Sequence, residues 1–312
     1  MHMVKVFIDG SAGTTGLRIV ERLAARPEIE LIKLPEAARK DPAARADALN
    51  QADIAFLCLP DAAAEEAVQM IESGHTAVID TSTAHRTAPG WVYGMPELIG
   101  QRERIAASRR VANPGCHASG FIALIAPLVH EGAISRDSLL HCFSLTGYSG
   151  GGKKMIAEYE GANRDKLLDA PRQYGLNQRH KHLKEMAAIC GLDHAPAFSP
   201  IVGDFYSGME VSVTLFGEQV SGGIARVREI YRDTYRGPVV RYAEGVDEAG
   251  FLSAGALSGR DDMEISVSGD DERMLLTARF DNLGKGASGA AIQNMNILMG
   301  LDETTGLVLE GE

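Results

Sequence analysis

Residues 4–16, VKVFIDGSAGTTG, decide the fold of the first part of the chain. Residues 4–9 have the pattern of a buried strand, and residues 15–26 have the apolar spacing of a helix. The glycines between them follow the spacing GxxGxxG, a relative of GxGxxG, which lets backbone amides approach a pyrophosphate where the helix begins. An ordinary glycine-rich turn is the alternative, but a motif that opens the first βαβ unit favours a dinucleotide site. The predicted loop consists of Gly10, Ser11, Ala12, Gly13, Thr14, Thr15 and Gly16.

Strands and helices continue to alternate up to about residue 113. Residues 29–34, 53–59 and 77–80 predict strands, and residues 62–72 predict a helix. The run DIAFLCL at 53–59 is continuously apolar, as expected for a parallel strand that is buried on both faces. We therefore predict an α/β fold that begins with a Rossmann-type, doubly wound parallel sheet.

The second part of the chain has longer and more regularly alternating strands, and it predicts an α+β domain. A mixed or antiparallel sheet with helices on one face fits this pattern. We expect a dinucleotide-binding domain at residues 1–113, completed by a C-terminal helix within 286–312, and a catalytic domain at 114–285. The predicted strands of this second domain are residues 139–145, 210–216, 263–268 and 274–280.

Composition excludes several classes of protein. The chain has 312 residues and a net charge of −11, which disfavours binding to nucleic acid or to an anionic membrane. No apolar run approaches the roughly 20 residues that span a bilayer, and the N-terminus lacks the pattern of a signal peptide. The four cysteines stand far apart without the spacing of a metal site, so we predict no metal and a reduced, cytoplasmic protein.

Cys116 is the candidate nucleophile. Residues 109–112 predict a strand, which is followed by NPGCHASG at 113–120 and then by an apolar helix. The beginning of a helix stabilises a thiolate through its dipole and its free amides, and the Pro-Gly turn can project the sulfur into a cleft. A small buried residue at a turn is the alternative, which we favour for the other three cysteines: Cys58, Cys142 and Cys190.

A thiolate nucleophile in a chain with a nicotinamide site restricts the chemistry. Hydride must be exchanged with a carbon held on sulfur, as in aldehyde dehydrogenases and acyl-phosphate reductases. Five segments, spread over nearly the full length, are similar to motifs of a known family. Together they make the chain resemble the shorter form of the N-acetyl-gamma-glutamyl-phosphate reductase family, within the aspartate-semialdehyde dehydrogenase superfamily. These segments are GSAGTTG, DTSTAHR (80–86), NPGCHASG, TGYSGGGK and GASGAAIQNMN (286–296).

The resemblance implies NADPH-dependent reduction of N-acetylglutamyl 5-phosphate to the semialdehyde, with release of phosphate, in arginine biosynthesis. It implies that Cys116 is the nucleophile and that Ser82 and Asn294 lie near the nicotinamide end of the cofactor. The choice of NADP over NAD comes from the resemblance, because the residues after the second predicted strand do not decide between the two cofactors. Glu36 could bind the ribose of NAD, whereas the adjacent basic residues Arg39 and Lys40 could bind the 2′-phosphate of NADP.

The acid/base residue is expected in the basic segment NQRHKHLKE at 177–185. An arbitrary HKH sequence is usually a solvated polar face, but this one is similar to the family's HRHxPEI stretch, which carries the acid/base histidine. We favour His180, with His182 as the alternative, because Lys184 stands where the family usually has proline. His117 adjoins the nucleophile but is expected to point elsewhere.

A second glycine loop, GYSGGGKK at 147–154, meets the spacing GxxxxGK of a nucleotide-binding P-loop. Lys154 stands where a P-loop has Ser or Thr, and no acidic strand end for magnesium follows, so a nucleoside triphosphatase is disfavoured. A plain glycine hinge is a further alternative. We expect the loop to hold the acyl phosphate or the released phosphate. The candidate phosphate and substrate residues are Ser149, Gly150, Lys153 and Arg86, and Arg164, Lys166 and Arg179 are further possibilities.

The partners are therefore expected to be a small acyl-phosphate substrate, phosphate and a second copy of the chain. An exposed sheet face in the second domain would suit a homodimer or homotetramer. The main alternative function is that of an aspartate-semialdehyde dehydrogenase or a related acyl-phosphate reductase, which performs the same chemistry on another acyl group. A dinucleotide-sensing regulator without turnover is an alternative from another class.

Overall fold

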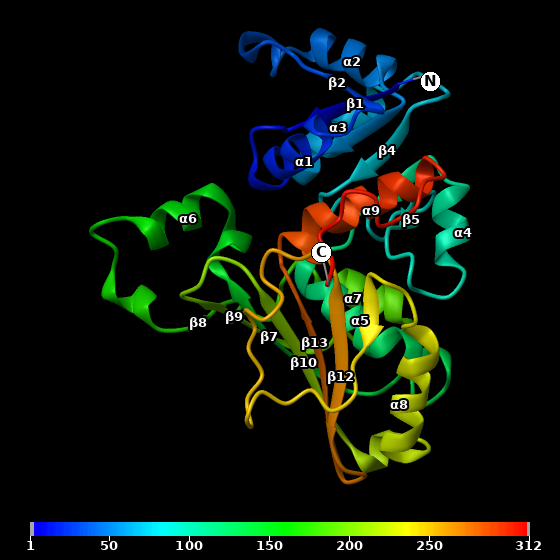
Figure 1. Cartoon of the computed structure of the whole chain (residues 1–312), viewed down its shortest axis with the longest axis vertical. Coiled ribbons are helices and arrows are strands. Elements are labelled where there is room, and N and C mark those ends of the chain that lie inside the picture. The colour runs from blue at the N-terminus through cyan, green and yellow to red at the C-terminus, as the bar shows by residue number, and fades with distance from the viewer. Residues whose placement is uncertain (1–2, 311–312) are drawn as a thin grey trace. The chain divides into compact units, whose positions relative to one another are not determined.

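The computed structural model describes residues 3–310 and divides into two compact units (Figure 1). Unit 1 contains the chain up to residue 96, residues 100–114 and residues 287–307. Unit 2 contains residues 97–99, residues 115–286 and the segment from residue 308. Each unit has its own sheet.

Unit 1 is built on a six-stranded sheet of order β2-β1-β3-β4-β6-β5, in which every pair is parallel. The order reverses beside β1, which makes the carboxyl end of β1 the place where ligands bind in doubly wound sheets. The strands are β1 (Val4–Asp9), β2 (Ile29–Ile32), β3 (Ile54–Leu57), β4 (Ala77–Asp80), β5 (Val92–Tyr93) and β6 (Arg110–Ala112). The helices are α1 (Thr14–Ala24), α2 (Pro42–Gln51), α3 (Asp61–Gln69), α4 (Gln101–Ala106) and α9 (Gly289–Leu298).

Unit 2 contains a seven-stranded mixed sheet of order β11-β12-β13-β10-β7-β9-β8. Two pairs, β7 with β9 and β11 with β12, are parallel, and the others are antiparallel. The strands are β7 (His141–Gly147), β8 (Arg172–Gln173), β9 (Ala197–Gly203), β10 (Met209–Phe216), β11 (Val240–Tyr242), β12 (Met263–Gly269) and β13 (Arg273–Phe280). The helices are α5 (Cys116–His130), α6 (Gly152–Glu160), α7 (Leu183–Cys190) and α8 (Gly223–Thr234).

Helix α5 is the central helix of unit 2. It packs against β10 and β13 and against α7 and α8, and most of its residues are buried (Figure 1). The contact with the sheet is close at Gly120, where an added Cβ would lie 2.6 Å from Val211 Cγ2 and 2.9 Å from Phe280 Cε1. Gly120 stands one helical turn after Cys116, so this close contact fixes the height of the first turn of α5 above the sheet.

The predicted α/β architecture is confirmed, and the predicted strands are present with ends shifted by one or two residues. Helix α2 was not predicted, because its alanine-rich sequence has little apolar periodicity. Its signal lies in its capping residues: the Asp41 carboxylate accepts a hydrogen bond from the Ala44 amide at 2.8 Å, and Pro42 occupies the first helical turn. No helix within residues 3–310 has both the length and the apolar character that crossing a membrane requires.

Candidate active site

The first glycine loop connects β1 to α1 at the edge of the sheet where the strand order reverses. Gly10 has a φ of +85°, and a Cβ there would collide with the carbonyl oxygen of Cys58. A Cβ on Gly16 would lie 2.5 Å from the carbonyl oxygen of Gly10. Gly13 is the N-cap of α1, and among the described residues no side chain caps this helix. Glycine is therefore needed at positions 10 and 16, and the first amides of α1 are available for an anion.

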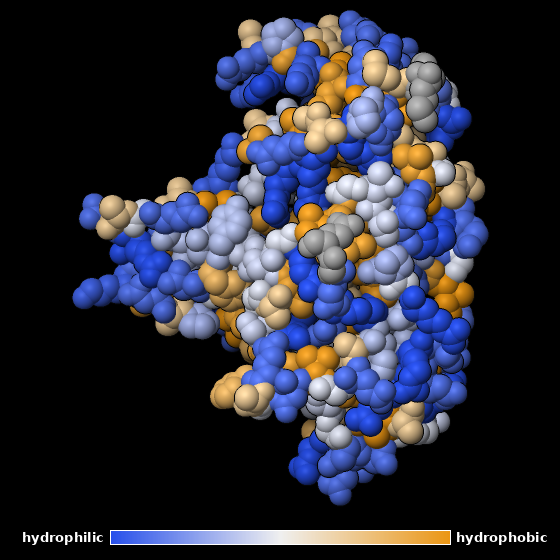
Figure 2. All heavy atoms as spheres, in the orientation of Figure 1, coloured by the Kyte–Doolittle hydropathy of each residue, from blue (hydrophilic) through white to orange (hydrophobic). Residues whose placement is uncertain are grey.

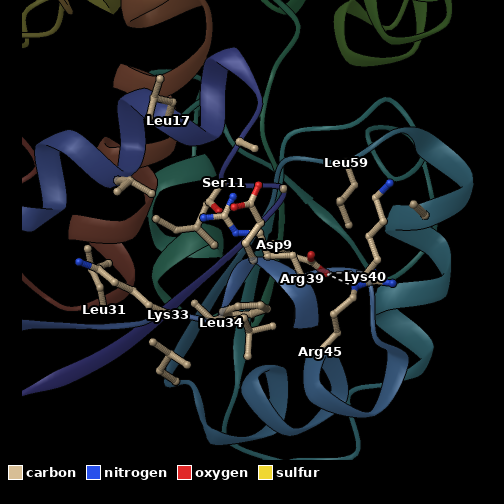
Figure 3. Close-up of a pocket in the computed structure, with 18 of the residues that line it drawn as sticks. Asp9, Ser11, Leu17, Leu31, Lys33, Leu34, Arg39, Lys40, Arg45 and Leu59 are labelled. Atoms are coloured by element: carbon tan, nitrogen blue, oxygen red, sulfur yellow. Dashed lines mark hydrogen bonds and ion pairs between the residues drawn. The ribbon is translucent and has the colours of Figure 1, made fainter.

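A pocket of about 850 Å³ lies beside this loop in unit 1 (Figure 3). Its apolar lining includes Leu31, Leu34 and Leu59, and Ser11 of the glycine loop also faces it. Arg39 and Lys40 line the pocket with exposed side chains, and within residues 3–310 neither side chain has an ion pair or hydrogen bond. Apolar walls suit an adenine ring and unpaired cations suit a phosphate, so the pocket fits the adenosine end of a dinucleotide.

The same pocket contains a buried ion pair. The Arg45 guanidinium donates to the Asp9 carboxylate from Nη2 at 2.9 Å and from Nε at 3.1 Å (Figure 3). Burial raises the pKa of Asp9 above its ordinary value, although the guanidinium opposes this shift. Asp9 is the last residue of β1, so the pair fixes the strand end from which the glycine loop starts.

Ser82 follows β4, and its orientation is fixed by a buried carboxylate. Asp80 accepts hydrogen bonds from the Ser82 amide at 2.9 Å and from the Ser82 hydroxyl at 2.7 Å. The same carboxylate lies 2.6 Å from His85 Nδ1. The nearby Arg86 is buried and donates to the carbonyl oxygens of Asn113 at 3.0 Å and Thr81 at 3.1 Å, so this guanidinium connects the segments that follow β4 and β6.

Asn294 lies on α9 and is fully buried. Its Nδ2 donates to the Gly94 carbonyl at 2.9 Å and to Asn113 Oδ1 at 3.2 Å. Its Oδ1 is buried and has no hydrogen-bond partner among the described residues. A buried amide oxygen without a donor is costly, and a donor group on a ligand would satisfy it.

Cys116 is the first residue of α5, as the sequence predicts. It is half-buried, and its helix has Gly115 as N-cap and no side-chain cap among the described residues. The turn before it is held by Glu185, whose Oε2 accepts a hydrogen bond from the Gly115 amide at 3.2 Å. Gly286 packs beside the cysteine, because a Cβ on Gly286 would lie 3.0 Å from Cys116 Cβ. A position at the start of a helix without a side-chain cap is the setting that favours a thiolate.

Three histidines gather within unit 2 close to the first turn of α5. The ring of His117 lies 5.7 Å from that of His180 and 5.5 Å from that of His182, and the rings of His180 and His182 are 4.7 Å apart. Burial, followed by the charge of Lys181, lowers the pKa of His180 to about 4. His182 is buried, and its Nε2 lies 3.9 Å from the Glu185 carboxylate. A carboxylate at this distance stabilises the protonated form of a histidine.

The second glycine loop forms a 3-10 turn over Tyr148–Gly151 and leads into α6. The amides of residues 147, 148 and 149 bond to carbonyls of residues 208, 205 and 206. The Ser149 hydroxyl is buried and accepts a hydrogen bond from Asn282 Nδ2 at 3.0 Å, which leaves its own proton for another acceptor. Lys153 is exposed on α6, where hydrophilic side chains predominate (Figure 2).

Three residues of this region were not predicted from the sequence: Glu185, Gly286 and Tyr174. The hydroxyl of Tyr174 lies 2.7 Å from His117 Nε2. The spacing of three residues between His182 and Glu185 at the start of a helix is a signal that could have identified the carboxylate. Gly286 and Tyr174 carry no such signal, because their contacts with α5 arise only from the fold. Within residues 3–310 no cluster of His, Cys, Asp and Glu could hold a metal ion.

Comparison with known proteins defines the class. Residues 5–108 match the family described as "Semialdehyde dehydrogenase, NAD binding domain", and residues 116–282 match "Semialdehyde dehydrogenase, dimerisation domain". The structure resembles aspartate semialdehyde dehydrogenase II of Vibrio cholerae, complexed with ASA, with a TM-score of 0.70 at 16% identity, covering 96% of this chain and 99% of that chain. It also resembles the enzyme of Candida albicans with NADP, with a TM-score of 0.66 at 15% identity, covering 95% and 98%. The chain therefore has the architecture of the semialdehyde dehydrogenases.

Closer relatives identify the family. The chain is 47% identical to the N-acetyl-gamma-glutamyl-phosphate reductase of Brucella ovis over 95% of its own length and 99% of that protein. It is 48% identical to the Brucella anthropi protein of the same name, over 95% and 98% of the two chains. The chain belongs to the N-acetyl-gamma-glutamyl-phosphate reductase family of oxidoreductases, and the predicted resemblance is confirmed. The two domain matches support a nicotinamide dinucleotide as cofactor and self-association of the chain.

The four cysteines should differ in their reaction with iodoacetamide at pH 8. Burial raises the pKa of Cys58 to about 12 and also raises the pKa values of Cys142 and Cys190, so these thiols stay protonated and unreactive. We expect Cys116 to be labelled at least about tenfold faster than the other three. Peptide mass spectrometry measures the rates, and Cys116→Ala should remove the fast reaction. Faster labelling of Cys58 than of Cys116 would contradict this prediction.

Proposed function

We propose that this chain catalyses the NADPH-dependent reductive dephosphorylation of N-acetyl-L-glutamyl 5-phosphate to N-acetyl-L-glutamate 5-semialdehyde, in arginine biosynthesis. The observation that carries the proposal is the position of Cys116 at the uncapped start of α5, in a chain that matches reductases of that name over 95% of its length. The relatives are named for this activity, and residues of the types that its chemistry needs are present in this chain.

Cys116 acts as the nucleophile in this proposal. Its thiolate attacks the acyl carbon of the substrate, a carbon–sulfur bond forms, and the carbon–oxygen bond to phosphate breaks. The helix dipole and the first amides of α5 favour the thiolate before attack. Reduction of the resulting thioester gives a thiohemiacetal, which collapses to the aldehyde and returns the thiolate.

Unit 1 would hold the cofactor. The glycine loop, Gly10 to Gly16, would hold the pyrophosphate with backbone amides, and Arg39 and Lys40 would hold the 2′-phosphate that distinguishes NADP from NAD. Ser82 and Asn294 would contact the nicotinamide end, where the unpartnered Oδ1 of Asn294 can accept a hydrogen bond. A bound reduced nicotinamide supplies the hydride for the thioester carbon.

The acid/base function would belong to the pair His180 and His182. Sequence reasoning favours His180, but the contacts give a stronger argument for His182. His180 Nδ1 accepts a hydrogen bond from the His182 amide at 3.3 Å, and burial keeps this imidazole neutral. His182 faces the Glu185 carboxylate, which favours the protonated ring that a general acid requires. We therefore propose that His182 exchanges the proton with the reacting oxygen and sulfur.

Phosphate binding would involve the second glycine loop. The Ser149 hydroxyl has a free proton, Gly150 permits close approach of the backbone, and Lys153 supplies a positive charge. Arg86 is a further proposed partner of the substrate, although two backbone carbonyls already bind its guanidinium.

We also propose the roles of the domains and the assembly. Residues 1–113 with the segment 286–312 would form the NADP-binding domain, and residues 114–285 the catalytic and dimerisation domain. Phe143 on β7 and Leu275 on β13 are exposed apolar side chains of the unit 2 sheet, which suits a homodimer or homotetramer. The four cysteines are free thiols, which supports a cytoplasmic location.

The proposed substrate can be tested with the reverse reaction. The chain should oxidise N-acetylglutamate semialdehyde in the presence of phosphate and NADP much faster than it oxidises aspartate semialdehyde. Cys116→Ser should lower turnover by at least about 10³-fold, as expected for a nucleophile, and Cys190→Ala serves as the control at a buried cysteine. Preference for aspartate semialdehyde would reassign the substrate, and near-normal turnover of Cys116→Ser would exclude the thioester.

The two histidines can be separated by substitution. His182→Asn should lower kcat by about 10²-fold or more with little change in KM for NADPH, because general acid–base catalysis contributes on this scale. His180→Asn should lower kcat by less than about tenfold. Steady-state kinetics measures both. A larger loss for His180→Asn than for His182→Asn would assign the proton transfer to His180.

Cofactor choice should depend on the two unpaired cations of the pocket. The double substitution Arg39→Ala and Lys40→Ala should raise KM for NADPH by about 10- to 100-fold, because charge-assisted hydrogen bonds to the 2′-phosphate are lost. The rate with NADH is the internal control and should stay nearly constant. An equal loss with both cofactors, or no loss, would place the 2′-phosphate elsewhere.

A further inference from the structure

Tyr174 has no role in the proposed reaction, yet its hydroxyl is directed into the histidine cluster beside Cys116. The ring packs against the small apolar cluster formed by Tyr159, Leu168 and Val202, and the Tyr174 amide donates to the Pro200 carbonyl. Within residues 3–310 the only hydrogen-bond partner of the hydroxyl is His117 Nε2, at 2.7 Å. Backbone and ring are therefore fixed, and the direction of the hydroxyl proton depends on the protonation of His117.

His117 is a neutral imidazole at physiological pH. Burial, followed by the charges of His180 and Lys181, lowers its pKa to about 3. A neutral imidazole has one nitrogen that donates and one that accepts. Nδ1 lies 2.7 Å from the Ser144 hydroxyl and Nε2 lies 2.7 Å from the Tyr174 hydroxyl, so one of these hydroxyls donates to the ring and the other accepts from it.

Ser144 decides between the two arrangements. It is fully buried on β7, and within the described part of the chain its hydroxyl contacts only His117 Nδ1. If Nδ1 donated the proton, the Ser144 hydroxyl proton would be buried without an acceptor, which is costly. Ser144 therefore donates to Nδ1, the ring proton resides on Nε2, and Nε2 donates to the Tyr174 oxygen. The proton of Tyr174 is left for another acceptor.

Cys116 is the candidate acceptor. It precedes His117 on the first turn of α5, so the ring that binds Tyr174 also brings the tyrosine to the start of this helix. Burial and then the charge of Cys116 raise the pKa of Tyr174 well above its ordinary value. The charge contribution agrees with the position of the hydroxyl beside the first turn of α5, which the bond to His117 Nε2 establishes.

We propose that Tyr174 donates a hydrogen bond to the thiolate of Cys116, and that His117 and Ser144 are positioning residues that direct the Tyr174 proton toward the sulfur. The proposal rests on the proposed function in that Cys116 is the nucleophile. A donor on the sulfur stabilises the thiolate before attack and again when the thiohemiacetal collapses.

Other titratable groups face this region and must remain constant in a test. They are His180, His182, Lys181 and Glu185, besides His117 and Tyr174 themselves. Tyr174→Phe keeps the ring and removes only the hydroxyl, so these groups keep their positions. Tyr159→Phe is the matched control, because Tyr159 belongs to the same apolar cluster and its hydroxyl binds Arg172 at 3.1 Å instead of the histidines.

The experiment measures the rate of alkylation of Cys116 by iodoacetamide between pH 5 and 10, on the full chain without substrate or cofactor. Tyr174→Phe should raise the midpoint of the rate–pH curve by about one unit, which is about a tenfold lower rate below the midpoint, because a hydrogen bond to a charged acceptor is lost. Tyr159→Phe should leave the curve unchanged. Ser144→Ala should move the midpoint in the same direction by less, since the tautomer of His117 is no longer fixed.

An unchanged midpoint for Tyr174→Phe, or an equal shift for Tyr159→Phe, would overturn the proposal. A Ser144→Ala curve identical to that of the unaltered chain would remove the positioning roles of Ser144 and His117. Alkylation needs no turnover, so the result does not depend on the proposed substrate. If the chain fails to reduce N-acetylglutamyl 5-phosphate but Tyr174→Phe shifts the midpoint, the proposed substrate is wrong and the role of Tyr174 is supported. If the chain is active and Tyr174→Phe does not shift the midpoint, the role of Tyr174 is refuted.

Discussion

The close packing of helix α5 on strands β10 and β13 is the constraint on which the candidate site depends. Gly120 permits this contact, since any side chain there would overlap Val211 and Phe280. The helix is held at its start by Glu185, which binds the Gly115 amide, and Gly286 packs against Cys116 itself. Three contacts from distant parts of unit 2 therefore determine where the first turn of α5 lies, and a position at the start of a helix favours a thiolate.

Local sequence pattern was sufficient for the fold class and for the position of Cys116 at the start of a helix. The glycine loop at Gly10–Gly16 and the strand-turn-helix around Cys116 are each encoded within about a dozen consecutive residues. Their local structures follow from turn geometry and helix capping, which depend only on near neighbours. Arg39 and Lys40 could be proposed from the same reasoning, because they follow the second strand of the first βαβ unit after one short 3-10 turn, and the structure places both at the pocket.

Most of the remaining contacts in the site could not be obtained from sequence, because they join residues far apart in the chain. His117 meets Ser144 and Tyr174, which lie 27 and 57 positions away, and Glu185 meets Gly115 across 70 positions. The proposed choice of His182 over His180 has the same origin, because it rests on the contact with Glu185 and on the burial of His180, which only the fold reveals. Histidine, serine, tyrosine and glutamate, considered one at a time, are also common on solvated surfaces.

The central claim is that Cys116 carries the acyl group during turnover. The most direct measurement mixes the chain, without NADPH, with N-acetylglutamyl 5-phosphate and follows phosphate release on the millisecond scale together with the mass of the Cys116 peptide. We expect a burst of one phosphate per site and an N-acetylglutamyl group on Cys116 that NADPH then removes by reduction. Absence of a burst, with an unmodified Cys116 peptide in a chain that is active when NADPH is added, would contradict the central claim.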